Sequence, residues 1–155
     1  MTHVPGALYV DAVEQRISLV TFGVRDLARS VRFYEAMGWH GQQADGTAFF
    51  QTGGIAVVLW GREELATDAG VDADGSGFSG MAIAHNVRSP GEVDEVIAAA
   101  ERAGAVVTRA AATTFYGGYA GYFADPDGHL WEIAHNPGFT LTDDGTLILP
   151  DFGTA

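Results

Sequence analysis

The sequence contains no cysteine, and this absence excludes several kinds of chemistry. Without thiols the chain has no disulfide framework, no thiolate nucleophile and no zinc site built on cysteine. It also lacks an apolar run long enough to cross a bilayer, and its first residues do not show the basic, apolar and small-residue pattern of a secretion signal. We therefore expect a cytoplasmic protein that does not bind membranes.

Basic residues are scarce as well. Only 8 Lys and Arg residues stand against 20 Asp and Glu residues, which gives a formal net charge of −12. This charge repels phosphate backbones and anionic lipid surfaces, so it disfavours nucleic acid and membranes as partners. A cationic ligand is compatible with it, although solubility alone also explains the acidity.

The chain does contain enough apolar material for a folded core. Hydrophobic residues make up 47% of the 155 positions, and 21 glycines allow many tight turns between short elements. We therefore treat residues 1–155 as a single domain.

The most informative segment is the DPDG turn at 125–128. Pro126 fixes φ at the first central position, and Gly128 can take the positive φ that closes a three-residue hairpin loop. The flanking runs, 119–124 and 129–135, are apolar and rich in aromatic residues, so they predict two antiparallel strands.

A carboxylate in the middle of the second of these strands needs an explanation. The register set by the turn places Glu132 opposite Tyr122 on the neighbouring strand. Buried charge is costly unless it is paired or bound to a metal. Glu132 is therefore either part of a functional site or one residue of a solvent-exposed strand face, and the pattern alone leaves both alternatives open.

Two segments of similar plan make up most of the chain. The first contains a strand at 17–24, a helix at 27–37 capped by Asp26 and ended by Gly38, and short strands near 47–51 and 55–60. The second contains a strand at 80–87, a helix begun by Ser89 and Pro90 and ended by Gly104, a strand at 105–108 and the DPDG hairpin. The sequences Val-Arg at 24–25 and 87–88 precede the two helices with a shift of 63 residues, which indicates an internal repeat.

The remaining segments have weaker patterns. Residues 62–80 are first charged and then rich in Gly, Asp and Ser, which is typical of a connector. Residues 7–13 favour an edge strand or an arm, and residues 146–149 favour a short strand in the C-terminal tail.

The segments 24–39 (VRDLARSVRFYEAMGW) and 121–133 (GYFADPDGHLWEI) resemble the vicinal oxygen chelate superfamily, which includes glyoxalase I, bleomycin-resistance proteins, fosfomycin-resistance proteins and extradiol dioxygenases. The resemblance covers about residues 17–137. It implies an α+β fold with two βαβββ modules in a pseudo-twofold arrangement, forming a curved mixed sheet around a cavity, and commonly a homodimer. The implied parts are module 1 at about 17–61, module 2 at about 79–137 and a C-terminal tail at 138–155.

The resemblance also implies where a metal would bind. Metal-dependent members take ligands from the first strand of each module and from a Glu on the last strand. Glu132 keeps the last of these positions, but Leu19 and Ala82 occupy the other two. One carboxylate does not hold a divalent ion, so we expect no native catalytic metal and no other cofactor. His85 lies at an odd offset from Ala82, and His129 and His135 lie at odd offsets from Glu132, so a regular strand puts them on the opposite face. A bulge that shifted one of them would restore a divalent metal site.

Other positions on the same strand faces are candidate ligand-binding residues. Thr21 shares the face of Leu19, and Asn86 shares the face of Ala82. Thr21 and Tyr122 match a threonine and a tyrosine that line the site in fosfomycin-resistance proteins. The aromatic candidates for stacking on a flat ligand are Phe50, Trp60, Tyr116 and Tyr119. Ordinary strand polarity and core packing are the alternative explanations for these residues.

Three functions fit these observations. We favour a small-molecule binding protein of the bleomycin-resistance type, without a metal, whose ligand is aromatic or cationic and contacts Glu132. The second is a lyase, isomerase or dioxygenase of this superfamily, either metal-dependent or with Glu132 as general base and with Tyr122 and Thr21 orienting the substrate. The third is an interaction module that binds no small ligand.

Overall fold

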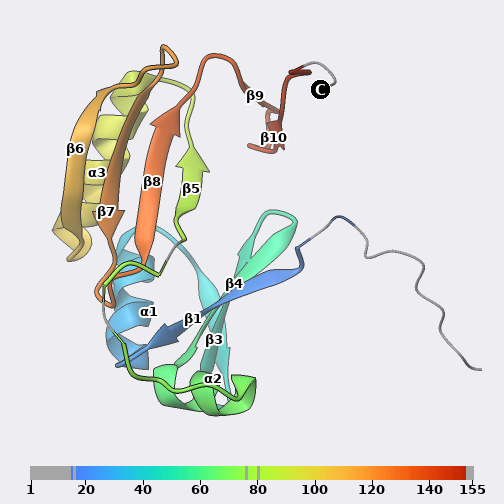
Figure 1. Ribbon diagram of the computed structural model, residues 1–155, viewed down its shortest axis with the longest axis vertical. Coiled ribbons are helices and arrows are strands. Elements are labelled where there is room, and N and C mark those ends of the chain that lie inside the picture. The colour runs from blue at the N-terminus through green and yellow to red at the C-terminus, as the bar shows by residue number, and fades with distance from the viewer. Residues whose placement is uncertain (1–14, 16, 76, 80, 153–155) are drawn as a thin grey trace, which may run out of the picture.

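The chain folds into two mixed four-stranded sheets, each covered on one face by a helix. The computed structural model describes residues 15, 17–75, 77–79 and 81–152. The N-terminal sheet has the strand order β1-β4-β3-β2, and the C-terminal sheet has the order β5-β8-β7-β6 (Figure 1). This α+β architecture of two modules is the one that the sequence predicts. The edge strand or arm predicted at 7–13 lies outside the described residues.

The two modules have matching elements. The first comprises β1 (Leu19–Val24), α1 (Leu27–Ala36), β2 (Gly41–Ala44), β3 (Thr47–Thr52) and β4 (Ile55–Gly61). The second comprises β5 (Ile83–Asn86), α3 (Pro90–Ala103), β6 (Val106–Thr113), β7 (Tyr119–Ala124) and β8 (Leu130–His135). The remaining elements are α2 (Arg62–Ala69), β9 (Thr140–Leu141) and β10 (Leu147–Ile148).

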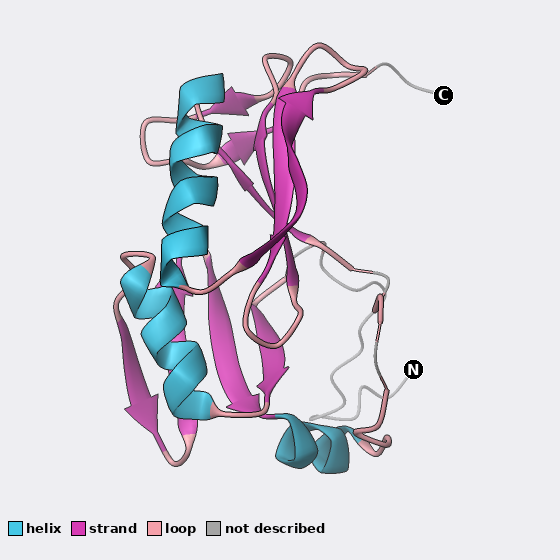
Figure 2. Cartoon of the chain, turned by 90° about the vertical axis from the view of Figure 1, so that its left-hand side faces the viewer, coloured by secondary structure: helices cyan, strands magenta, loops and turns pink. Residues whose placement is uncertain are grey.

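The same pairing pattern recurs in both sheets. The first strand of each module runs parallel to the last, β1 to β4 and β5 to β8, and the other pairs are antiparallel. Figure 2 shows α3 above α1 on the left of the molecule, with most of the strands to their right. The buried core lies between these helices and the two sheets. It includes the helix-facing side chains of Phe22, Phe50, Phe123 and Ile133.

The predicted helix ends are confirmed and follow from local hydrogen bonds. The Asp26 carboxylate accepts a hydrogen bond from a backbone N–H in the first turn of α1. At α3 the Ser89 hydroxyl accepts from the Glu92 N–H at 3.2 Å, and the Glu92 carboxylate accepts from the N–H of Arg88 before the cap at 2.7 Å, an arrangement related to the capping box. Gly104 ends α3 with φ of 112°, a conformation that only glycine adopts at little cost.

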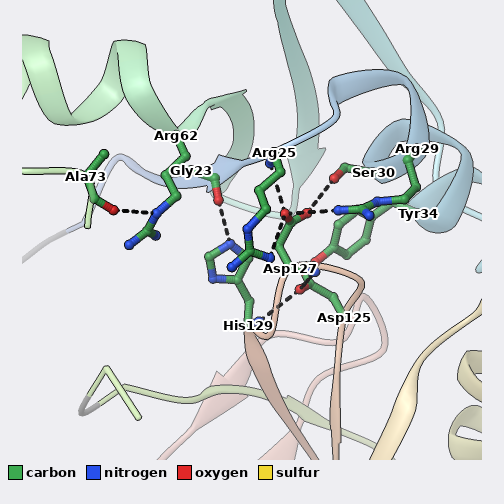
Figure 3. Close-up of polar contacts among 10 residues, drawn as sticks. All are labelled: Gly23, Arg25, Arg29, Ser30, Tyr34, Arg62, Ala73, Asp125, Asp127 and His129. Carbon is green, nitrogen blue, oxygen red and sulfur yellow. Dashed lines mark hydrogen bonds and ion pairs between the residues drawn. The ribbon is translucent and has the colours of Figure 1, made fainter. Parts of the chain in front are cut away.

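The DPDG turn joins the two modules (Figure 3). It lies between β7 and β8, and its Asp127 carboxylate is seated at the start of α1 with only 3% of the side chain exposed. One oxygen accepts from the Arg25 N–H at 2.9 Å and from the Arg29 guanidinium at 3.2 Å, and the other accepts from the Ser30 hydroxyl at 2.8 Å. The charge is therefore paired and hydrogen-bonded at the positive end of a helix, which offsets its burial.

A second carboxylate of the turn, Asp125, also connects the two modules. Asp125 accepts from the Tyr34 hydroxyl at 2.7 Å and from two backbone N–H groups inside its own turn. Trp131 donates its indole N–H to the same Tyr34 oxygen at 3.2 Å. Burial, followed by the charge of Asp125, raises the pKa of Tyr34 far above its ordinary value. The phenol therefore stays protonated as a donor between the modules.

One expectation about the connecting segments is wrong, and one predicted strand is longer than expected. Residues 62–80 are not a connector throughout, because 62–69 form α2. This helix buries only Ala66, so its sequence carries no amphipathic period. The strand predicted at 105–108 extends to Thr113 in β6, with irregular pairing to β7 along its length. Within the described residues no helix is long and apolar enough to cross a membrane.

We expect Asp127→Ala to lower the free energy of unfolding by about 2–4 kcal/mol, because it leaves the Ser30 hydroxyl and the Arg25 N–H without their acceptor. Urea denaturation would measure the difference. Asp143→Ala is the matched control, since this tail carboxylate is exposed and its loss should change stability by less than about 0.5 kcal/mol. Equal effects of the two substitutions would contradict the stabilising role of Asp127 between the modules.

Candidate functional site

The candidate site lies on the face of the C-terminal sheet that points away from α3, which we call the open face. Three side chains occupy directly paired positions across it: Arg109 on β6 pairs with Tyr122 on β7, and Tyr122 pairs with Glu132 on β8. Ala84 on β5 continues the same row next to Glu132. Paired positions put their side chains on the same face of a sheet, so the row brings a guanidinium, a phenol and a carboxylate together.

Tyr122 and Glu132 form the polar centre of this row. The Tyr122 hydroxyl donates a short hydrogen bond to the Glu132 carboxylate, at the pairing that the turn predicts. That hydrogen bond, with desolvation and the charge of Glu132, raises the pKa of Tyr122. Arg109 opposes the rise, because its guanidinium lies over the Tyr122 ring at 5.4 Å from the ring centroid. The phenol is therefore a protonated donor beside an ionisable acceptor.

Small residues and a second tyrosine lie near this centre. Ala120 and Ala134 are paired with each other on the open face, two residues along their strands from Tyr122 and Glu132. Tyr116, from the loop between β6 and β7, lies against Gly118, where an added Cβ would meet the Tyr116 ring at 2.5 Å. The charge of Tyr116 also contributes to the raised pKa of Tyr122. The loop thus brings a second phenol toward the row.

The other predicted polar and aromatic candidates are divided between the two sheets. Asn86 pairs with Ala134 on the open face of the C-terminal sheet, as its strand parity predicts. Thr21 pairs with Val58 on the corresponding face of the N-terminal sheet. Trp60 lies on that face too, opposite Thr47.

Two predicted ligand-binding residues lie on the helix-facing side instead. Phe50 pairs with Val57 and is 2% exposed in the core, whereas its neighbour Phe49 is on the open side and 39% exposed. Tyr119 is on the α3 side of β7 and donates its hydroxyl to Asp94 at 2.7 Å. Strand parity separates each of these residues from the Glu132 face.

The donor groups do not fit a metal centre. Leu19 and Ala84 carry no ligand atoms, and neither does Ala82, which precedes β5. Among the residues that the structure describes, no group of three or more His, Asp or Glu side chains could hold a metal ion. We therefore derive no chemical step through a metal.

The histidines near the site have other partners. His129 stacks on Phe22 at 4.6 Å, and its Nε2 lies 2.9 Å from the Gly23 carbonyl. The Nδ1 of His135 lies 3.3 Å from the Val87 carbonyl. A carbonyl oxygen only accepts, so each of these ring nitrogens is the donor. Both side chains contact backbone rather than the Glu132 face.

A cavity of about 780 Å³ lies between the modules, beside the end of β5. It is bordered by the β3–β4 hairpin on one side and by the C-terminal tail on the other. Of the predicted ligand-binding residues it contains Asn86 and Phe50, and it contains neither Tyr122 nor Glu132. The side chains of Arg109, Tyr122 and Glu132 therefore do not line this cavity, although Ala84 and Asn86 on the same sheet face do.

Arg109 could not be found by sequence reasoning. Its position opposite Tyr122 depends on register shifts in β6 between Val107 and Arg109 and between Arg109 and Ala112. Such bulges change which side chains share a face. The only hint in the sequence was a charged side chain within a strand that otherwise contains Val, Ala and Thr.

Two modules of β-strand, helix and three strands, joined through a DPDG turn, define a class of paired-module proteins. The chain belongs to the Glyoxalase/Bleomycin resistance protein/Dioxygenase superfamily, whose model matches residues 16–133. No curated protein matches the chain.

Solved structures agree with this assignment. A glyoxalase-related enzyme from Fulvimarina pelagi is 38% identical, with a TM-score of 0.79 over 87% of this chain and 98% of that one. A glyoxalase/bleomycin resistance protein/dioxygenase from Nocardioides is 25% identical, with a TM-score of 0.68 over 83% and 89% of the two chains. Lactoylglutathione lyase from Agrobacterium tumefaciens is 20% identical, with a TM-score of 0.60 over 78% and 93%, and this likeness concerns the fold alone.

Proposed function

We propose that the protein binds a small organic molecule on the open face of its C-terminal sheet, without a native catalytic metal. The observation that carries the proposal is the hydrogen-bonded pair of Tyr122 and Glu132 in the middle of that face. A carboxylate that served only to solvate a strand would not need a phenol donor.

The same pair supports a second candidate, an enzyme that uses Glu132 as general base. A carboxylate that already accepts a proton-bearing group at hydrogen-bond distance is positioned to accept one from a substrate. Tyr122, kept protonated by its raised pKa, would donate to the oxygen on which negative charge develops. The similarity to a glyoxalase-related enzyme favours this candidate.

Replacement of Glu132 separates these roles. We expect Glu132→Gln to weaken binding of a small aromatic amine such as phenethylamine by about tenfold, because the cation loses its charged acceptor. Binding of a neutral aromatic probe such as benzamide should stay within about twofold, and any activity that needs a general base should be abolished. Isothermal titration calorimetry would measure the affinities. Glu95→Gln, at an exposed position of α3, is the matched control. Unchanged affinities and activity in Glu132→Gln would refute the site.

The metal-free part of the proposal rests on the donor set around Glu132. We expect the protein, purified without a histidine tag, to contain far less than one transition-metal ion per chain by elemental analysis. Addition of Zn²⁺, Mn²⁺, Ni²⁺ or Co²⁺ should not produce a saturable rise in melting temperature, since one carboxylate does not hold such an ion. About one tightly held ion per chain would show that other ligands complete a metal centre.

We also propose that the protein is a homodimer in which a second copy covers the open side of the N-terminal sheet. Leu19 and Phe49 on that side are 49% and 39% exposed. A solvent-facing sheet surface normally alternates to polar residues there. The internal repeat makes a symmetric pair of such faces a simple solution.

Phe49→Glu should therefore shift the protein from dimer to monomer in sedimentation velocity, because the introduced charge would be buried in the interface. Phe78→Glu is the control, as Phe78 is 76% exposed but lies in the connector before β5. A wild-type protein that sediments as a monomer, or a Phe49→Glu variant that remains dimeric, would contradict this arrangement.

A further inference from the structure

Arg109 is the one cationic group in the row that contains Tyr122 and Glu132. It lies on β6 between two shifts in the pairing register, and this local irregularity puts it directly opposite Tyr122. Its guanidinium carbon is 5.4 Å from the centroid of the Tyr122 ring. Stacking on the ring limits the orientations of the guanidinium and leaves its N–H edge available in the plane.

The hydrogen-bonding capacity of this guanidinium is not used inside the described part of the chain. There Arg109 forms no ion pair and no side-chain hydrogen bond, whereas Arg25 and Arg29 both contact Asp127 and Arg62 donates to the Ala73 carbonyl at 2.8 Å. A guanidinium has five N–H donors in a fixed fork that matches two oxygens of a carboxylate or phosphonate. Arg109 therefore presents an oxyanion-binding edge beside the Tyr122–Glu132 pair.

The overall charge of the protein makes this local cation important for an anionic ligand. The chain carries 20 acidic residues and 8 basic ones, so its long-range field repels anions. A ligand with a negative group needs a positive contact within the site to overcome that repulsion. Of the three polar side chains in the row, Arg109 alone supplies it.

We propose that Arg109 is a specificity-determining residue that binds an oxyanion group of the ligand, while Glu132 accepts a hydrogen bond from an amine or hydroxyl group of the same molecule. The ligand class is then a small amino or hydroxy acid rather than a simple cation. This inference rests on the proposed function of the same face.

The spacing of the row supports a small ligand. Neighbouring strands lie about 4.8 Å apart, so the backbones at Arg109 and Glu132, two strands apart, are separated by about 10 Å. The Arg109 guanidinium and the Glu132 carboxylate both reach toward Tyr122, which lies between them. Two ligand groups a few bonds apart can therefore contact both side chains.

Three probes with one aromatic ring and different charges test this inference. 3-Phenylpropionate carries only a carboxylate, phenethylamine only an ammonium group, and L-phenylalanine both. Binding to the full-length protein would be followed by NMR of ¹³C-labelled tyrosine rings, with the Tyr122 signal assigned from Tyr122→Phe. We expect both carboxylate probes to shift this signal. Arg109→Gln should weaken the binding of both carboxylate probes by about tenfold and leave the affinity for phenethylamine unchanged.

Two further variants make the result specific. Arg102→Gln removes the same charge from the last turn of α3 and should leave all three affinities unchanged. Arg109→Lys keeps the charge but loses the fork, so it should recover only part of the carboxylate affinity. Unperturbed spectra away from β6 would show that each variant is folded.

The outcomes separate this inference from the proposed function. If 3-phenylpropionate does not move the Tyr122 signal up to its solubility limit, or binds the wild type and Arg109→Gln equally, the role of Arg109 is wrong. Phenethylamine binding that is lost in Glu132→Gln would in that case still support the proposed site. If none of the three probes binds to the wild type, both proposals fail.

Discussion

The fold depends on the seating of one carboxylate. Asp127 is almost completely buried, yet its oxygens have partners only because the turn after β7 reaches the start of α1. If the modules separated, Asp127 would regain water, but Ser30 and Tyr34 would lose the acceptors around which the core is packed. The motif that marks the family in the sequence thus has a structural role between the modules, and the carboxylate of the proposed site is Glu132, four residues beyond the glycine of the motif.

The connection through the DPDG turn is present on only one side of the pseudo-twofold arrangement. The turn between β3 and β4 contains Gly53, which has no side chain to place at the start of α3. There Ser89 and Glu92 cap the helix from within, and the Arg88 side chain donates to the Thr142 carbonyl of the tail at 3.0 Å. The repeat has kept its topology, while one junction is closed by carboxylates and the other borders a cavity.

Features set by short-range chemistry could be predicted from the sequence. The DPDG turn fixes the register that pairs Tyr122 with Glu132, and the caps at Asp26 and Ser89 depend on residues within one helical turn. The assignment of side chains to faces failed where it depended on exact strand position. In β3 a one-residue difference puts Phe50 in the core and Phe49 on the open side.

The position of Arg109 could not be predicted from the sequence either, because it also depends on exact strand register. Its place in the row follows from bulges in β6, which no local pattern marks. With Arg109 included, the open face holds a carboxylate and a guanidinium on either side of one phenol, so its local charge is balanced although the chain is strongly acidic. A ligand that contacts both groups would gain two charge-assisted contacts, whereas a simple cation would gain one. Under the proposal for Arg109, the electrostatics of the face therefore favour a ligand with both charges over the simple cation that composition alone suggests.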